Sequence, residues 1–261
     1  MMKPRKYVRA MLREKVVFGP ISSRRLGASL GINLLPENGK LCNFDCIYCE
    51  CGWNRDGRGD RRLPDLETVR DALESKLKAC VADGVRIDSL TFSGDGEPTL
   101  HPDFLAIIDQ TLALRDRYCP DARVSVLTNA TRLDVGDVFA ALRRVDSPIL
   151  KLDAPTKELA CRINRPQGKY DVDRVVAGMK RFEGDFILQT MFLRARDFDS
   201  SSPEVLLPWM DIVRDLHPRE IMAYTIARPT PQAGLAKFSV EEMAAMLRPL
   251  IEEGFNLKIY G

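Results

Sequence analysis

The sequence predicts an α/β fold, a partial (β/α)6 TIM-like barrel with parallel strands. Apolar runs of strand length alternate with stretches of helical periodicity along the chain, and this alternation is typical of βαβ units on a parallel sheet. Polar, turn-rich segments follow four successive predicted strands, and a barrel of this class gathers its functional side chains at those strand ends. We expect one domain over residues 1–261, with residues 1–28 as a basic N-terminal extension.

The first predicted strand covers residues 31–35 and ends at Pro36. A helix is predicted over residues 64–82, because apolar side chains recur there at helical spacing: Leu66, Val69, Leu73, Leu77 and Val81. Gly84 then supplies a C-cap. The later strands are predicted over residues 87–92, 123–127, 148–152, 186–192, 220–226 and 256–260. The later helices are predicted from Pro102 onward and over residues 135–142, 172–182, 203–216 and 240–253.

The loop after the first predicted strand carries Cys42, Cys46 and Cys49 within eight residues. This spacing lets a short loop turn three thiolates toward one point. Three thiolates can ligate three irons of a [4Fe–4S] cluster and leave the fourth iron without a protein ligand. An iron with an open coordination position favours catalysis over electron storage.

Two other interpretations of these cysteines stay open. Cys51 adds a fourth thiol, and four thiolates also build a closed, tetrahedral zinc site, although the spacing from Cys49 to Cys51 is tighter than zinc sites normally use. A disulfide is the other alternative, but disulfides belong to oxidising compartments. The seven cysteines accompany no secretion signal and no apolar stretch of about 18 residues. We therefore expect reduced thiols in a cytoplasmic protein without a membrane span.

The formal net charge of +2 gives no global signal for nucleic-acid or membrane binding. Basic residues nevertheless cluster near the N-terminus and after the cysteine loop: Lys3, Arg5, Lys6, Arg9, Arg13, Arg55, Arg58, Arg61 and Arg62. They either form a solvated surface or attract an anionic substrate. The same two interpretations apply to Arg162 and Arg165, because the guanidinium fork suits carboxylates and phosphates.

With these motifs the chain resembles the radical S-adenosylmethionine (SAM) superfamily over about residues 17–231. The cysteine triplet, with Tyr48 just before its third member, is the most specific match. Three later segments are similar to family elements, each with one departure. They are Gly96-Glu97-Pro98 for Gly-Gly-Glu-Pro, with Asp95 in place of the first glycine; Thr128-Asn129 for Thr-Asn-Gly, with Ala130 in place of glycine; and Leu152-Asp153-Ala154 for Ser-Leu-Asp-Ala, with Lys151 in place of serine.

A narrower resemblance rests on the segments Phe18–Gly27 and Gly94–Pro102. Both are similar to a largely uncharacterised group of iron–sulfur oxidoreductases. That group resembles the radical SAM enzyme of wyosine synthesis in tRNA. This narrower resemblance does not establish a reaction for this chain.

The resemblance implies an enzyme in which a [4Fe–4S] cluster reductively cleaves S-adenosyl-L-methionine to a 5′-deoxyadenosyl radical, which abstracts hydrogen from a substrate. It implies Cys42, Cys46 and Cys49 as cluster ligands. The implied cofactor-binding residues are Tyr48, Gly96, Glu97, Thr128, Asn129, Lys151, Asp153, Gln189 and Ile226. Lys151 and Asp153 are also our candidates for a catalytic role, because alternate residues of a strand face the same side. For Gln189 and Ile226, packing inside the barrel competes with cofactor contact.

Partners and substrate stay open. The resemblance implies an electron donor such as a flavodoxin or ferredoxin, and a substrate that is a tRNA base, a small anionic molecule or a partner protein. An alternative hypothesis is a zinc-stabilised α/β module that binds nucleic acid through its basic N-terminal region. Only two histidines are present, and His101 and His217 are interpreted as helix-terminal residues rather than acid–base groups.

Overall fold

The computed structural model describes residues 15–37, 39–56 and 61–261. Their contacts divide the chain into two compact units. Unit 1 comprises residues 1–42, 53–128 and 134–148, and unit 2 comprises residues 43–52, 129–133 and 149–261. The expectation of a single domain stays a prediction. Several basic residues noted above lie outside the described residues, namely Lys3, Arg5, Lys6, Arg9, Arg13 and Arg58.

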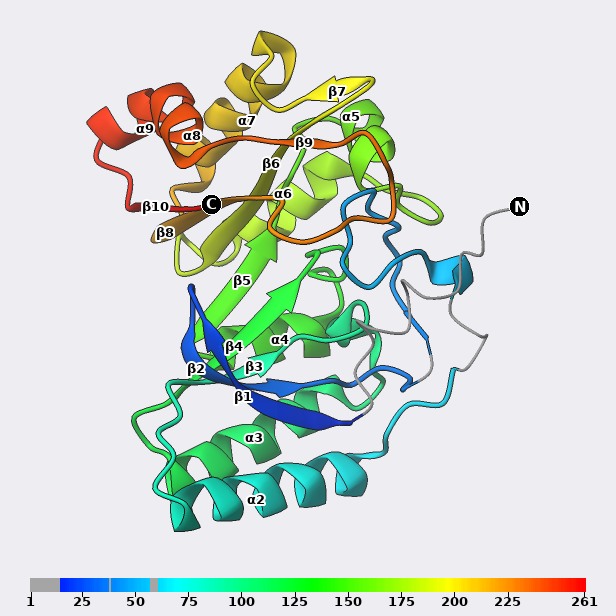
Figure 1. The fold of residues 1–261 in the computed structure, drawn as a ribbon, viewed down its shortest axis with the longest axis vertical. Helices are drawn as coiled ribbons and strands as arrows, with labels where there is room; N and C mark the ends of the chain where they lie inside the picture. The colour runs from blue at the N-terminus through cyan, green and yellow to red at the C-terminus, as the bar shows by residue number, and fades with distance from the viewer. Residues whose placement is uncertain (1–14, 38, 57–60) are drawn as a thin grey trace. The chain divides into compact units, whose positions relative to one another are not determined.

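Unit 1 contains a sheet whose described strands are β1 (Val17–Ser23), β2 (Gly27–Ile32), β3 (Ser89–Phe92) and β4 (Arg123–Thr128). β1 pairs with β2 in antiparallel orientation, while β2, β3 and β4 run parallel (Figure 1). Ile32 lies opposite Phe92, and Phe92 lies opposite Val126. The three parallel strands therefore end at one edge, and the polar segments that follow them leave the sheet at the same place.

The hairpin of β1 and β2 was not predicted. The ring of Phe18 covers Gly31, where a Cβ atom would come within 2.1 Å of the ring, so the missing side chain at this position makes room for the ring. The strand predicted over residues 31–35 instead begins at Gly27 and ends at Ile32. The strand ends there because the side chain of Asn33 bonds to the backbone that follows. Its Oδ1 accepts hydrogen bonds from the backbone N of Leu35 and of Asp95, both at 3.2 Å.

The helices of unit 1 are α2 (Leu66–Ala82), α3 (Phe104–Tyr118) and α4 (Gly136–Arg144). α3 packs against both α2 and α4, and Figure 1 shows α2 and α3 side by side. The carboxylate of Asp65 caps α2 by accepting a hydrogen bond from the backbone N of Thr68 at 2.7 Å. The buried face of α2 consists of Val69, Leu73, Leu77 and Cys80. Val81 was expected on this face but is 56% exposed, because the helical period brings Cys80 there instead.

Unit 2 contains a second parallel set of strands. β5 (Ser147–Lys151), whose first two residues belong to unit 1, pairs with β6 (Ile187–Ala195), β6 pairs with β8 (Glu220–Thr225), and β8 pairs with β10 (Leu257–Tyr260). Two short strands, β7 (Phe198–Asp199) and β9 (Ala236–Lys237), pair with β6 in antiparallel orientation. Neither short strand was predicted, because two residues carry no recognisable period.

The helices of unit 2 are α5 (Lys157–Ile163), α6 (Val172–Lys180), α7 (Pro203–Leu216), α8 (Val240–Met246) and α9 (Arg248–Glu252). α5 lies where a loop was expected, and Thr156 caps it by accepting a hydrogen bond from the backbone N of Leu159. The helix predicted over residues 240–253 is two helices that meet at Leu247. Pro249 explains the break, since proline lacks the N–H that a continuous helix uses.

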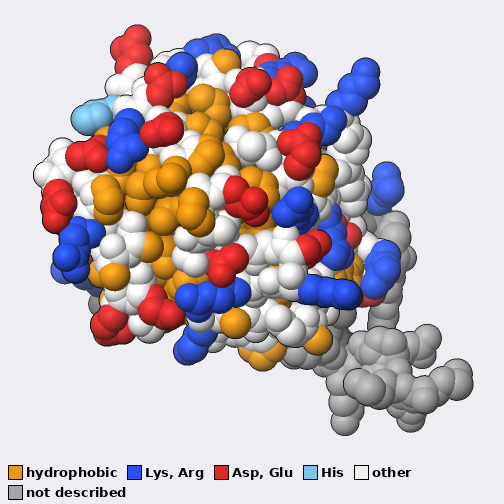
Figure 2. Space-filling model, turned by 90° about the horizontal axis from the view of Figure 1, so that it is seen from above, with side chains coloured by type: hydrophobic (Ala, Val, Ile, Leu, Met, Phe, Trp, Pro, Cys, Tyr) orange, Lys and Arg blue, Asp and Glu red, His pale blue; other side chains and the backbone are white. Residues whose placement is uncertain are grey.

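These elements confirm the predicted fold class, a mixed α/β structure with mostly parallel strands. Within the described part of the chain, no helix is both long and apolar enough to cross a membrane. Three exposed apolar side chains of unit 2, Leu207, Val240 and Ile251, lie on α7, α8 and α9. Figure 2 shows hydrophobic side chains interspersed with acidic and basic ones on the face viewed there.

Two substitutions in α2 test its buried face. Leu77 is fully buried and Val81 is 56% exposed. We expect Leu77→Ala to lower the free energy of unfolding by about 2–5 kcal/mol, because it leaves a cavity. Val81→Ala should change the free energy of unfolding by less than about 0.5 kcal/mol. Urea denaturation followed by circular dichroism measures both, and equal losses would contradict this orientation of the helix.

Candidate functional site

Glu97 is the centre of a buried polar cluster at the strand edge of unit 1. Its Oε1 accepts hydrogen bonds from Oγ1 of Thr128 at 2.6 Å, from Oγ1 of Thr99 at 2.6 Å and from the backbone N of Thr99 at 3.1 Å. Glu97, Thr99 and Thr128 are all buried. The structure therefore brings together two of the predicted cofactor-binding residues, Glu97 and Thr128, and holds the carboxylate in one orientation.

Gly96 lets the segment before Cys42 approach the Glu97 loop. Leu41 and Gly96 form an isolated parallel bridge, in which the N of Leu41 donates to the O of Asp95 at 2.9 Å and the N of Glu97 donates to the O of Leu41 at 3.0 Å. Gly96 has φ of +145°, and a Cβ there would lie 1.8 Å from the carbonyl O of Leu41. Only glycine fits this close approach, and the predicted cofactor-binding role of Gly96 stays a prediction.

Backbone hydrogen bonds hold the cysteine loop within unit 2. The N of Asp45 donates to the O of Asn164 at 2.9 Å, and the N of Ile47 donates to the O of Ile163 at 2.9 Å. The loop is therefore attached to the end of α5 on both sides of Cys46. The N of Cys49 donates to the O of Cys46 at 3.1 Å, so the two cysteines lie in one turn.

The side chain of Asn43 holds the start of the same loop. Its Nδ2 donates to Oγ1 of Thr131 at 2.6 Å, and its Oδ1 accepts from Nδ2 of Asn129 at 2.6 Å. Asn129 also accepts a hydrogen bond from Oγ1 of Thr131 at 2.7 Å. The cofactor-binding role predicted for Asn129 stays a prediction, and these contacts also let it position the start of the cysteine loop. Asn43 was not singled out from the sequence, because one asparagine in a polar loop carries no pattern.

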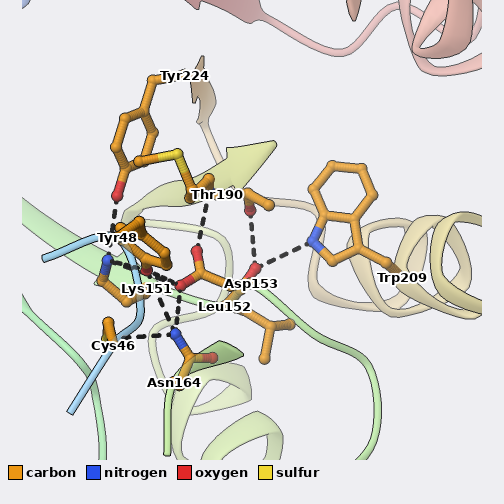
Figure 3. Close-up of polar contacts among 10 residues, drawn as sticks. Cys46, Tyr48, Lys151, Leu152, Asp153, Asn164, Thr190, Trp209 and Tyr224 are labelled. Carbon is orange, nitrogen blue, oxygen red and sulfur yellow. Dashed lines mark hydrogen bonds and ion pairs between the residues drawn. The ribbon is translucent and has the colours of Figure 1, made fainter. Parts of the chain in front are cut away.

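Asp153 is the centre of a second polar network, which Figure 3 shows. Its carboxylate is completely buried. Oδ1 accepts a hydrogen bond from the backbone N of Met191 at 2.9 Å, and Oδ2 accepts from Nδ2 of Asn164 at 2.7 Å and from the hydroxyl of Tyr48. The carboxylate thus holds together the cysteine loop, the end of α5 and β6. Its predicted catalytic role stays a prediction, and the geometry makes it a positioning residue.

Lys151 lies beside this network with its ammonium group between two tyrosines. Nζ donates to Oη of Tyr48 at 2.9 Å and to Oη of Tyr224 at 3.1 Å, and it lies 3.7 Å from Oδ2 of Asp153. It also lies 5.0 Å from the ring centre of Tyr48 and 5.8 Å from that of Tyr224. The side chain is 16% exposed, so one side of it remains accessible.

The charges in this network are fixed by their neighbours. Burial by itself lowers the pKa of Lys151, but Asp153 and the tyrosine contact outweigh it, and the pKa ends above its usual value. Burial raises the pKa of Tyr48 well above its usual value, and Asp153 adds to this rise. Lys151 is therefore an ammonium group and Tyr48 is a neutral donor to the Asp153 carboxylate at neutral pH.

The carbonyl oxygen of Leu152 fixes the end of β5. It accepts hydrogen bonds from Oγ1 of Thr190 at 2.8 Å and from Nε1 of Trp209 at 3.2 Å (Figure 3). Both donors are buried, so water does not compete with these bonds. Lys151 and Asp153 flank this carbonyl, and their backbone is therefore held rigidly between β6 and α7.

Gln189 lies in the same layer as Lys151. Lys151 is opposite Gln189 in the sheet, and Gln189 is opposite Met222. The side chain of Gln189 is 4% exposed, and its amide makes no hydrogen bond with any residue that the structure describes. An amide that makes no hydrogen bond within the described protein is able to donate to and accept from a ligand. Ile226 follows β8 and is half-buried.

Other predicted residues have structural contacts. Nδ1 of His101 accepts from the backbone N of Asp103 at 3.1 Å, which leaves Nε2 to donate to the O of Pro64 at 2.8 Å. His217 is the C-cap of α7. Both histidines therefore lie at helix ends, as predicted. Arg165 donates to Oε1 of Gln232 at 2.8 Å and Arg162 to the O of Asp197 at 3.1 Å, so neither guanidinium extends freely into solvent.

The cysteines fit a thiolate-ligated cluster. None of the seven forms a disulfide; Cys46 is buried, and Cys42, Cys49 and Cys51 are half-buried. Sγ of Cys46 receives a hydrogen bond from Nδ2 of Asn164 at 3.4 Å, a contact suited to a thiolate. Among the described residues, the structure contains no group of three or more His, Cys, Asp or Glu side chains close enough to hold a single metal ion. Thiols that form no disulfide and lie beside an amide donor suit an iron–sulfur ligand set.

A family model described as the radical SAM superfamily matches residues 39–186. The chain belongs to the radical SAM superfamily. The match begins just before the cysteine loop and includes the Glu97 cluster, Lys151, Asp153 and Asn164. Membership of this family supports an enzyme that uses SAM.

Relatives of known sequence are similar over most of this chain. A protein named GTPase Obg from Brachyspira hyodysenteriae is 30% identical over 90% of the chain, which spans 33% of that protein. A UPF0026 protein from Methanocaldococcus jannaschii is 29% identical over 89% of the chain, which spans 70% of that protein. The chain therefore spans about a third of the first relative, and the activity of that whole protein is not transferred to it.

Solved structures share the fold at low sequence identity. A radical SAM methyltransferase from Sphaerobacter thermophilus has a TM-score of 0.67 at 16% identity, covering 89% of this chain and 66% of that chain. SuiB from Streptococcus suis bound to S-adenosylmethionine has a TM-score of 0.63 at 16% identity, covering 86% of this chain and 49% of that chain. These matches agree with the predicted partial barrel.

The expected similarity to the wyosine enzyme is supported only in part. A structure of archaeal TYW1 has a TM-score of 0.54 at 11% identity, covering 86% of this chain and 71% of that chain. At this identity the match shows the fold alone.

Gly96→Ala tests the close approach of Leu41, just before Cys42, to the Glu97 loop. The new Cβ would overlap the carbonyl O of Leu41, and φ of +145° is strained for alanine. We expect a loss of at least about 1–3 kcal/mol in the free energy of unfolding and less iron bound per chain after reconstitution. Gly136→Ala is the matched control, because a Cβ there meets nothing within 4 Å. Similar iron content and stability in both variants would contradict this role of Gly96.

Proposed function

We propose that this protein is a radical SAM iron–sulfur enzyme that binds a [4Fe–4S] cluster through Cys42, Cys46 and Cys49 and takes S-adenosyl-L-methionine as its cofactor. When bound, the reduced cluster would supply one electron to SAM, and breaking of the C5′–S bond would give methionine and a 5′-deoxyadenosyl radical able to take a hydrogen atom from the substrate. The family match supports this function. The observation that carries it is the network joining Cys46, Tyr48, Lys151 and Asp153.

Lys151 is proposed to bind the carboxylate of SAM. Its ammonium group is held between Tyr48 and Tyr224, and its accessible side offers a charge-assisted hydrogen bond. Asp153 keeps this ammonium charged and positioned without itself reaching the solvent. Gln189, with its buried amide, is proposed to bind a ribose hydroxyl, since it can both donate and accept.

Glu97 is proposed to accept a hydrogen bond from the amino group of SAM. Three donors from Thr99 and Thr128 hold its carboxylate in place, so little side-chain entropy would be lost on binding. Gly96 contributes the close backbone approach, and Tyr48 and Ile226 are proposed to lie against the adenosine. Asn129, whose amide donates to Asn43 in the cysteine loop, is proposed as a further polar contact to the cofactor.

The substrate class and the redox partner remain proposals from the family resemblance. Radical SAM chemistry requires a one-electron reductant, and a flavodoxin or ferredoxin in a cytoplasmic setting would supply it. A tRNA base, a small anionic molecule and a partner protein all stay as candidate substrates. Arg165 and Arg228 do not help to choose between these substrates, because their guanidinium groups already contact Gln232 and Glu50, respectively.

Cysteine substitutions test the cluster. Anaerobic reconstitution with iron and sulfide should give a brown protein that forms 5′-deoxyadenosine from SAM when reduced with dithionite. Cys46→Ala should lose the cluster absorbance, because Cys thiolates hold the cluster. It should also lose at least about 100-fold of this activity, because the cluster supplies the electron. Cys51→Ala is the control and should keep both, because a fourth thiolate would occupy the open iron. A colourless protein that binds one zinc per chain would contradict the proposed function.

Lys151→Met tests the carboxylate contact. A hydrogen bond to a charged group contributes about 1.5–3 kcal/mol, so we expect the dissociation constant for SAM to rise by about 10- to 100-fold. Lys237→Met, on the exposed strand β9, is the control and should leave the dissociation constant for SAM unchanged. Isothermal titration calorimetry of the reconstituted protein measures both values. Equal affinities for wild type and Lys151→Met would exclude this contact.

A further inference from the structure

We propose that Asn164 is a positioning residue that donates a hydrogen bond to the sulfur of Cys46 and thereby raises the reduction potential of the cluster. This inference rests on the proposed function. It assigns a specific role to the segment from Arg162 to Pro166, which the sequence suggested only as a solvated loop or an anion clamp.

The orientation of the Asn164 amide follows from its neighbours. Nδ2 lies 2.7 Å from Oδ2 of Asp153, 3.4 Å from Sγ of Cys46 and 3.3 Å from Oη of Tyr48 (Figure 3). A carboxylate accepts hydrogen bonds and cannot donate them, so the group that faces Asp153 must be the NH2 and not the carbonyl oxygen. The same NH2 group is the one that faces the sulfur.

The amide of Asn164 has two N–H bonds. The shorter contact uses one of them for Asp153. The second N–H is within reach of Sγ of Cys46 at 3.4 Å and of Oη of Tyr48 at 3.3 Å. The hydroxyl of Tyr48 already donates to Asp153 and accepts from Nζ of Lys151 at 2.9 Å. The sulfur of Cys46 is therefore an acceptor that the second N–H shares with this hydroxyl.

The backbone fixes the distance between Asn164 and Cys46. The residues on either side of Cys46, Asp45 and Ile47, donate their backbone N–H groups to the carbonyl oxygens of Asn164 and Ile163, both at 2.9 Å. Asn164 is 2% exposed and Cys46 is 7% exposed, so water is not available to replace the amide. The contact is thus built into the fold and is not a chance approach of two surface side chains.

A hydrogen bond to a ligating sulfur changes the electron affinity of an iron–sulfur cluster. The reduced cluster carries one more negative charge, part of which lies on the sulfur atoms. A donor at that sulfur stabilises the reduced form more than the oxidised form, and the reduction potential rises. Asn164 also contacts Asp153, which contacts Lys151 through space at 3.7 Å, so the same amide connects the sulfur to the group proposed to bind SAM.

A redox titration of two variants tests the inference. Asn164→Leu removes the donor at similar volume, and Thr190→Val removes a buried hydrogen bond of the same region, to the O of Leu152, without a contact to Cys46. In a dithionite titration followed by electron paramagnetic resonance, we expect the ratio of reduced to oxidised cluster at a fixed potential to fall about tenfold in Asn164→Leu, which is about 59 mV for one electron. Thr190→Val should keep the wild-type ratio. An unchanged ratio in Asn164→Leu, or an equal shift in both variants, overturns the inference.

A second measurement needs no variant. Wild-type protein labelled with ¹⁵N at the asparagine side-chain amides should show a nitrogen coupling to the reduced cluster in pulsed electron paramagnetic resonance. The expected source is Asn164, whose Nδ2 lies 3.4 Å from Sγ of Cys46. Absence of this coupling overturns the inference even where Asn164→Leu does not fold. A wild-type chain that assembles no cluster overturns the proposed function itself, which distinguishes the two failures.

Discussion

The burial of the Asp153 carboxylate is the constraint on which the polar network of unit 2 depends. A carboxylate with no exposure is stable only when its oxygens are hydrogen-bonded or paired with charge. The backbone of Met191 and the side chains of Asn164 and Tyr48 meet this need, with Lys151 close by. Each of these groups comes from a different segment, so satisfying one carboxylate also places the cysteine loop against β5 and β6.

Unit 1 also contains a buried carboxylate, that of Glu97. There two threonine hydroxyls and one backbone N–H donate to Oε1 of the carboxylate. Both carboxylates are thus held in one orientation by hydrogen-bond donors, which are Thr99 and Thr128 for Glu97 and three separate segments for Asp153.

Sequence reasoning found the alternating strands, the cysteine triplet and the residues at the strand ends, because each has a period or a spacing that can be recognised. It did not find α5, β1 or the role of Asn164. α5 is only seven residues long, and β1 has a bulged pairing with β2 rather than a regular one. Asn164 acts through a contact with a residue 118 positions away, and nothing local in the chain encodes that partner.

The Trp209 contact to the carbonyl of Leu152 also has a spectroscopic consequence. The chain contains two tryptophans; Trp53 belongs to unit 1 and Trp209 to unit 2. The indole of Trp209 is almost fully buried, and its N–H is bonded to the residue that precedes Asp153. Its fluorescence is therefore an intrinsic optical signal from the interior of this network. Trp53 is half-buried, with the guanidinium of Arg55 5.8 Å from its ring centre, so its emission reports separately on the chain that follows the cysteine loop.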